Sequence, residues 1–192
     1  MKKIVIGMLT AVLAVSMAAC SDATLGDSTS IPESGAESSF DPTENPDYTK
    51  IDSDHFIIYY NDNWETFEQV GTDCALHFTG GDEKNTGDEA ATIIGVQVMD
   101  SGGFPLSSYT DSMRKAYDGL YEVVEENGTT IAGNNAYYFK LTVPEDESGV
   151  ILMQEFVVTE KYAYVFHITY AESSYNSIKP EIDKILNTFK IK

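Results

Sequence analysis

The sequence VILMQEFVVTEKYAYVFHITY, at residues 150–170, decides the fold. Two runs rich in β-branched and aromatic residues, 150–159 and 162–170, flank the polar pair Glu160-Lys161. Such runs favour extended strands, and a short polar connection between two of them is typical of a hairpin. The segment therefore predicts two long antiparallel strands.

Further strands are predicted on both sides of this hairpin. Apolar side chains alternate with others along residues 55–60 and 92–99, and a further strand follows Asn134-Asn135 at 137–143. A period of two is the pattern of a strand with one buried face. The chain should therefore contain a run of hairpins.

Two segments have the period of a helix instead. From Tyr109 to Val124 apolar residues recur at steps of three and four, which predicts an amphipathic helix between Pro105 and Asn127-Gly128. A second stripe, from Ile178 to Phe189, predicts a C-terminal helix with Pro180 in its first turn. Strands, helix, hairpins and helix in this order indicate an α+β fold, a mainly antiparallel β-sheet with helices packed on it.

Four segments resemble PsbP-like domains. They are Phe56-Ile57-Ile58-Tyr59-Tyr60 followed by Asn63-Trp64, then residues 131–137, 162–170 and 185–191. The resemblance implies a PsbP-like α/β sandwich. It also implies a link to bacterial lipoproteins, since many bacterial members of the family carry a lipid anchor. We infer no photosynthetic role from it.

The N-terminus has the features of an export signal. Lys2 and Lys3 precede an apolar run at 4–17, and Ser16-Met17-Ala18-Ala19-Cys20 resembles the bacterial lipoprotein box. The resemblance implies that residues 1–19 are a signal peptide and that Cys20 becomes the lipidated first residue. The alternative is an ordinary signal peptide with a chance cysteine. We expect a protein held in the cell membrane by its lipid anchor and facing outside the cytoplasm.

Residues 20–54 are expected to form a disordered acidic linker, and residues 55–192 the globular domain. Residues 21–54 contain nine acidic residues, one Lys and few large apolar side chains. The whole chain has 31 Asp+Glu against 12 Lys+Arg and a net charge of −19. This charge excludes nucleic acid and an anionic lipid surface as electrostatic partners, because both repel a polyanion.

No catalytic, cofactor-binding or metal-ligating residue is predicted. Cys74 begins an alternating run and is interpreted as a small buried apolar residue. His55, His77 and His167 fall in three different strands. The acid-rich loop 81–89 is a weak calcium candidate, because Lys84 stands where an EF-hand needs an oxygen ligand. We interpret this loop as solvated.

Tyrosines are abundant in the predicted strands and leave two interpretations open. They either fill the core or line a groove for a carbohydrate or peptide. We favour the core for this set: Tyr59, Tyr60, Tyr137, Tyr138, Tyr162, Tyr164 and Tyr170.

The function expected from these features is that of a non-catalytic binding or accessory domain on an extracytoplasmic lipoprotein. Its partner would be an envelope protein or a small-molecule ligand. One alternative is a hydrolase whose carboxylates assemble only in three dimensions. Another is an assembly factor for an envelope complex.

Overall fold

The computed structural model describes residue 42 and residues 45–80, 91–144 and 148–192. By its internal contacts the folded unit spans Pro42–Lys192. The expectations for the signal peptide, for Cys20, for most of the linker and for the loop 81–89 concern residues outside the described part of the chain. Within that part, no helix combines the length and the apolar character needed to span a membrane.

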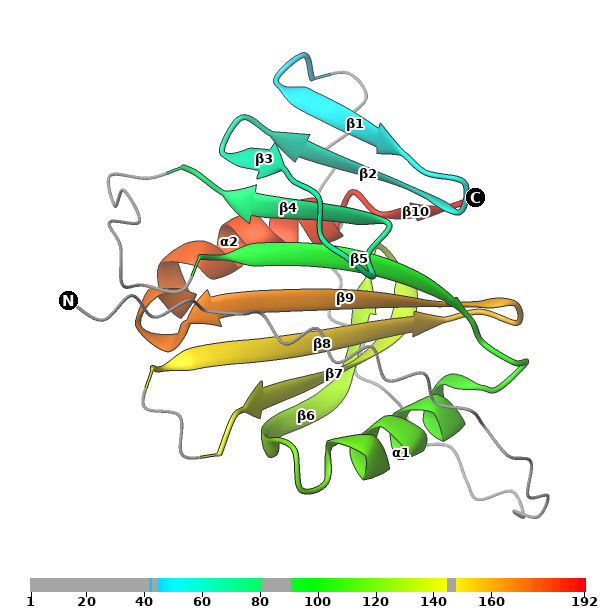
Figure 1. Ribbon diagram of the computed structural model, residues 1–192. Coiled ribbons are helices and arrows are strands. Elements are labelled where there is room, and N and C mark those ends of the chain that lie inside the picture. The colour runs from blue at the N-terminus through cyan, green and yellow to red at the C-terminus, as the bar shows by residue number, and fades with distance from the viewer. Residues whose placement is uncertain (1–41, 43–44, 81–90, 145–147) are drawn as a thin grey trace. The chain divides into compact units, whose positions relative to one another are not determined.

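The strands form two antiparallel sheets (Figure 1). The small sheet has the order β1-β2-β10, and the large one has the order β3-β4-β5-β9-β8-β7-β6. Two helices pack on them, so the predicted α+β fold is confirmed. The elements are β1 Tyr48–Asp52, β2 Phe56–Asn61, β3 Trp64–Thr66, β4 Cys74–Phe78, β5 Ile93–Asp100, α1 Leu106–Tyr117, β6 Glu122–Ile131, β7 Asn134–Thr142, β8 Val150–Val158, β9 Tyr162–Ala171, α2 Tyr175–Leu186 and β10 Lys190–Ile191.

The hairpin of β8 and β9 lies in the interior of the large sheet, as its apolar composition requires. β9 pairs with β5 on one side and with β8 on the other. Its alternate residues face opposite sides: Phe166 and Ile168 join a core with α2, whereas Ala163 and Val165 join a second core with α1. The sheet is therefore covered on both faces.

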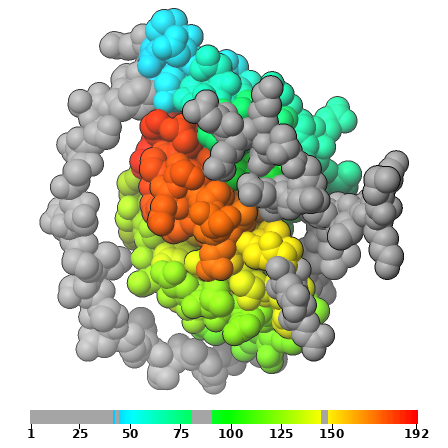
Figure 2. Space-filling view, turned by 90° about the vertical axis from the view of Figure 1, so that its left-hand side faces the viewer, coloured from blue at the N-terminus to red at the C-terminus, as the bar shows by residue number. Residues whose placement is uncertain are grey.

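The first core holds the two sheets and α2 together. Ile178, Ile182 and Ile185 of α2 are at most 5 % exposed and pack in one cluster with strands of both sheets. Figure 2 shows α2, in orange and red, between β1 and β2 in cyan and the lime-green segment of β6 and β7. The second core contains Tyr109 and Tyr117 of α1.

The beginning of the globular domain was predicted too late. The expected linker runs to residue 54, but β1 occupies Tyr48–Asp52 and pairs with β2. Ile51 packs against the first core, and this contact makes a strand of an otherwise polar, exposed segment. Acidic composition alone did not reveal that contact.

The first helix is also shorter than predicted. α1 ends at Tyr117, and β6 begins at Glu122, within the range expected to be helical, and continues to Ile131. Gly119 has φ +75, a backbone conformation that stops the helix. Beyond it, Val123 and Val124 are β-branched and enter a strand that pairs with β7.

The C-terminal helix was predicted correctly but begins earlier. α2 starts at Tyr175 with Ser174 as its N-cap residue, so Pro180 lies inside the helix and not in its first turn. Proline removes the hydrogen bond to the carbonyl of Asn176. Asn176 and Pro180 are both exposed, so water can hydrate that carbonyl.

Candidate functional site

The residues predicted as possible functional groups are spread over the domain. His55 lies just before β2, His77 on β4 and His167 on β9. Within the described ranges there is no group of three His, Cys, Asp or Glu placed to hold a metal ion. Cys74 packs against the first core, and burial raises the pKa of its thiol to about 12.

Three of the seven tyrosines expected in the core are buried, and the other four are only partly buried. Tyr59, Tyr164 and Tyr170 are at most 8 % exposed. Tyr60, Tyr137, Tyr138 and Tyr162 are half-buried along the strands. Tyr109 and Tyr117 of α1 are buried too, which fills the second core with aromatic rings.

A row of five residues, three of them polar, crosses the face of the large sheet that α1 covers. The strand registers place Gly95, His167, Gln154, Phe139 and Glu126 side by side, from β5 across to β6. His167 Nε2 lies 3.3 Å from Gln97 Oε1, and burial lowers the pKa of His167 to about 4. The imidazole is therefore neutral near pH 7.

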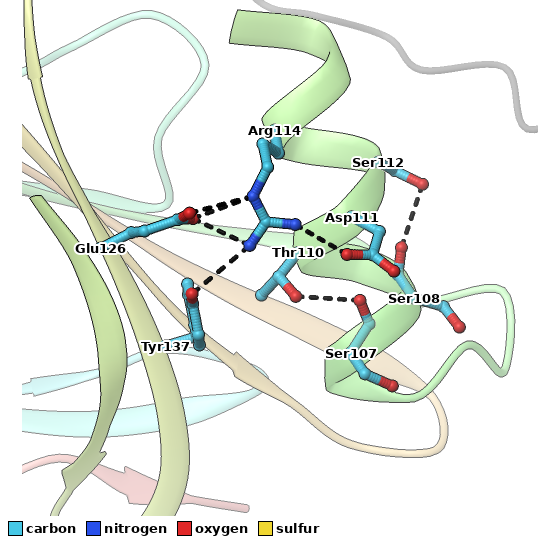
Figure 3. Close-up of polar contacts among 8 residues, drawn as sticks. All are labelled: Ser107, Ser108, Thr110, Asp111, Ser112, Arg114, Glu126 and Tyr137. Atoms are coloured by element: carbon cyan, nitrogen blue, oxygen red, sulfur yellow. Dashed lines mark hydrogen bonds and ion pairs between the residues drawn. The ribbon is translucent and has the colours of Figure 1, made fainter. Parts of the chain in front are cut away.

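The last member of this row, Glu126, is bound by an arginine of α1 (Figure 3). Arg114 Nη2 donates to Glu126 Oε2 at 2.9 Å, and Nε lies 3.1 Å from both carboxylate oxygens. Arg114 Nη1 donates to Asp111 Oδ1 at 2.7 Å, and the guanidinium group stands over the Phe139 ring. The hydrogen bond to Glu126 raises the pKa of Arg114 further above its usual range. The guanidinium group thus fastens α1 to the large sheet and is already engaged by carboxylates.

An open pocket of about 400 Å³ lies next to this contact. Its lining comes from the end of α1, the turn after it and the start of β6, and consists of Arg114, Lys115, Asp118, Tyr121 and Val123. One lining residue, Arg114, is held by Glu126 and Asp111, while the pocket itself is open and mixed in polarity. Such a shape suits a side chain of a partner better than an enclosed small molecule.

Large exposed apolar side chains lie on the segments next to this pocket, and one of them, Val123, lines it. Among the described residues, five large apolar side chains are exposed. Four of them lie at the α1–β6 turn, on β6 and just after β7. The four are Leu120, Val123, Val124 and Val143, with exposed fractions of 51 %, 36 %, 49 % and 49 %. We call these four residues the α1–β6 corner.

The sequence analysis missed this corner because it placed residues 118–127 in a helix. In a helix, Leu120 and Val124 would lie on the buried stripe with Tyr109 and Met113. The adjacent pair Val123-Val124 just after Gly119 was the available signal for a strand.

A second cluster lies on the opposite face of the sheet, under α2. Glu155 of β8 is 8 % exposed and stands beside Tyr138 of β7. Burial raises the pKa of Glu155 to about 7, with a further rise from Asp183 and a decrease from Lys179, both on α2. The hydroxyl of Tyr170 is buried and has no hydrogen-bond partner among the described residues.

The fold is that of PsbP-like domains. Cyanobacterial PsbP (CyanoP) from Synechocystis sp. PCC 6803 superposes with a TM-score of 0.53 at 13 % identity, over 82 % of this chain and 100 % of that one. LpqN of Mycobacterium tuberculosis, involved in cell envelope biogenesis, gives 0.56 at 10 % identity, over 76 % and 90 %. A Pseudomonas aeruginosa protein of unknown function, a putative regulator, gives 0.50 at 12 % identity, over 73 % and 94 %.

No family model matches this chain, and no curated protein matches it. The resemblance predicted from four short segments is thus confirmed at the level of the fold.

Proposed function

We propose that this protein is a lipid-anchored, extracytoplasmic accessory protein whose PsbP-like domain binds an envelope partner and does not catalyse a reaction. The anchor rests on the motif that ends at Cys20. A solved structure of the same fold, LpqN, belongs to a protein involved in cell envelope biogenesis, which agrees with an envelope location.

The observation that carries the binding role is the α1–β6 corner. An exposed apolar cluster costs solvation free energy in an isolated domain, and it is a common mark of a protein-binding surface. Here Val123 of the corner lines an open pocket, and another lining residue, Arg114, is held by Glu126 and Asp111.

The anchor is tested by Cys20→Ser, with Cys74→Ser as the matched control. We expect wild type and Cys74→Ser to remain in washed envelopes, and Cys20→Ser to lose the acyl mass and leave the membrane fraction. An unmodified thiol at Cys20 in the wild-type protein would refute the anchor.

The binding role is tested by cross-linking the lipidated protein in intact cells and identifying the proteins recovered with it. We expect a defined envelope protein or complex, which would also identify an assembly role. Recovery of no protein, together with saturable binding of a small molecule, would refute a protein partner.

The alternative of a hydrolase has one observation in its favour. Glu155, with a pKa of about 7, has the proton affinity of a general acid or base. If the purified protein hydrolyses an ester, glycoside or peptide and Glu155→Gln abolishes that turnover, the hydrolase replaces the accessory protein. We favour the accessory protein because Glu155 lies beneath α2 and away from the open pocket.

A further inference from the structure

β6 forms one edge of the large sheet over ten residues. In the described part of the chain it pairs only with β7, and nine of its ten residues are at least partly exposed. The opposite edge strand, β3, has three residues. An edge strand presents unpaired N–H and C=O groups along its outer side, and these are a template for another strand.

The two faces of β6 differ in chemistry. Val123 and Glu126 stand opposite Leu141 and Phe139 on the α1 side of the sheet. Glu122 and Glu125 lie on the other side, where their partners are Thr142 and Lys140. A strand added beside β6 would alternate between these two environments, since its side chains have a period of two.

We propose that the edge of β6 accepts a β-strand from a partner protein in which basic and apolar side chains alternate. The basic side chains would lie beside Glu122 and Glu125. The apolar ones would cover Val123 and enter the pocket lined by Tyr121. This inference rests on the proposed accessory function and specifies its partner.

Charge selects this occupant over two others. A second copy of the chain would bring a domain of the same negative net charge to this edge, which is unfavourable. The chain's own residues 21–54 carry nine acidic residues and one Lys, and the range 55–192 has a net charge of −13. A basic partner is attracted by the domain as a whole and is oriented by the edge.

Gly128 in the middle of β6 offers a specific test. Its N–H donates to Asn127 Oδ1 at 2.9 Å, and a Cβ added at Gly128 would meet no heavy atom within 4 Å. Gly128→Pro removes this N–H without changing the charge, and proline is tolerated on an edge strand where the N–H faces solvent. Gly128→Ala keeps the N–H and is the matched control.

The experiment uses the full mature chain, residues 20–192, with Cys20→Ser so that no detergent is needed. The probe is a fluorescent ten-residue peptide alternating Lys and Val, and its control alternates Glu and Val. By fluorescence anisotropy we expect the Lys–Val peptide to bind at least tenfold tighter than the Glu–Val peptide. Gly128→Pro should weaken its binding at least tenfold, and Gly128→Ala less than twofold.

Two results would overturn the inference. One is unchanged peptide affinity in a Gly128→Pro protein that retains the wild-type near-ultraviolet circular dichroism. The other is equal affinity for both peptides. If Gly128→Pro unfolds the domain, Glu122→Lys together with Glu125→Lys takes its place, and at least a tenfold loss of Lys–Val binding is expected.

A cross-linking experiment in cells distinguishes a failure of this inference from a failure of the proposed function. A photocrosslinking side chain is placed at Val124, and at Val70 as a control, since Val70 is 85 % exposed and precedes β4 near the other end of the strand order. A cross-link to an envelope protein from Val124 that is lost in Gly128→Pro supports both proposals. A partner that cross-links from Val70, or that survives Gly128→Pro, refutes the β6 site and leaves the accessory function standing.

Discussion

The carboxyl group of Glu155 shows how one buried residue sets a pH dependence. Burial raises its pKa from 4.5 to about 7, so the folded state binds its proton more tightly than the unfolded state does. Between pH 4.5 and 7 the folded state therefore carries more protons. The stability that it contributes is present at low pH and falls as pH rises through this window.

Glu155→Gln should remove that decrease. We expect the variant to be more stable than wild type at pH 8, by at most about 3 kcal/mol, and nearly equal to it at pH 4. Urea unfolding at both pH values measures this, with the exposed Glu122→Gln as control. A Glu155→Gln protein that is less stable at pH 8 would show that the carboxylate is satisfied in the fold.

His167 on the opposite face should act in the other direction. Burial lowers its pKa from 6.5 to about 4, so the unfolded state binds the proton more tightly. Its contribution is present above pH 6.5 and is lost as pH falls towards 4. In wild type, Glu155 lowers and His167 raises the free energy of unfolding as pH rises from 4.5 to 6.5, so the two contributions oppose each other.

In His167→Gln, the pH dependence of the free energy of unfolding should therefore show the contribution of Glu155 alone. We expect the variant to lose stability as pH rises from 4.5 to 6.5, whereas wild type changes little. Unfolding free energies at half-unit intervals provide the measurement. His77→Gln, at a half-exposed position on β4, is the control. If His167→Gln has the same dependence of unfolding free energy on pH as wild type, the expected opposition between His167 and Glu155 is wrong.

Individual residues were predictable from sequence where local chemistry decides them. Cys74 was expected to be buried because its neighbours alternate, and it is partly buried against the first core. Glu155 was not noticed, because nothing in its local sequence says that a carboxyl group will lie under a helix. The pairing of Arg114 with Glu126 was hidden for a different reason: both residues were assigned to one helix, although they belong to α1 and β6.

At the scale of elements, one buried hydroxyl group adds polar contacts to the apolar packing between α2 and the small sheet. Thr188, 2 % exposed, accepts a hydrogen bond from the N–H of Tyr59 at 2.8 Å. Its Oγ1 also lies 2.7 Å from the carbonyl of Ile185, at the end of α2. The hydroxyl thus joins β2 to the helix C-terminus.

Thr188→Val keeps the shape of the side chain and removes the hydrogen bonds of its hydroxyl group. Because the N–H of Tyr59 would then be buried without a partner, we expect a loss of about 1–3 kcal/mol in the free energy of unfolding. Thr188→Ser, which retains the hydroxyl, should cost less than Thr188→Val. Chemical denaturation measures both, and equal losses in the two variants would contradict the role of the hydroxyl.

Elements were predictable where period and length agree, as in the β8–β9 hairpin and α2. They were not predictable where one apolar pattern fits two periods. Residues 118–127 have the apolar spacing of a helix. They form a turn and a strand because Gly119 ends the helix and β6 pairs with β7. β1 shows the same dependence on distant contacts, since a single partly buried Ile51 ties it to the core.

At the scale of the whole molecule, the large sheet connects the two cores. β9 contributes Phe166 to one and Val165 to the other, so loss of the sheet removes both. We expect a single cooperative transition in urea. Fluorescence of Trp64, 2 % exposed in the first core, should report the same midpoint as hydrogen exchange of the α1 amides. An earlier opening of α1 would show that the second core is a separate unit.

The order of the small sheet has a consequence for biosynthesis. β2 receives one neighbour from Tyr48–Asp52 and the other from Lys190–Ile191, next to the last residue of the chain. Phe189, 1 % exposed, contacts the rings of Phe56, Tyr164 and Phe166. A nascent polypeptide therefore cannot complete this domain until Phe189 and β10 have been synthesised. Any product that ends prematurely before Phe189 leaves those three rings uncovered, and proteases that survey newly made proteins can recognise it as unfinished.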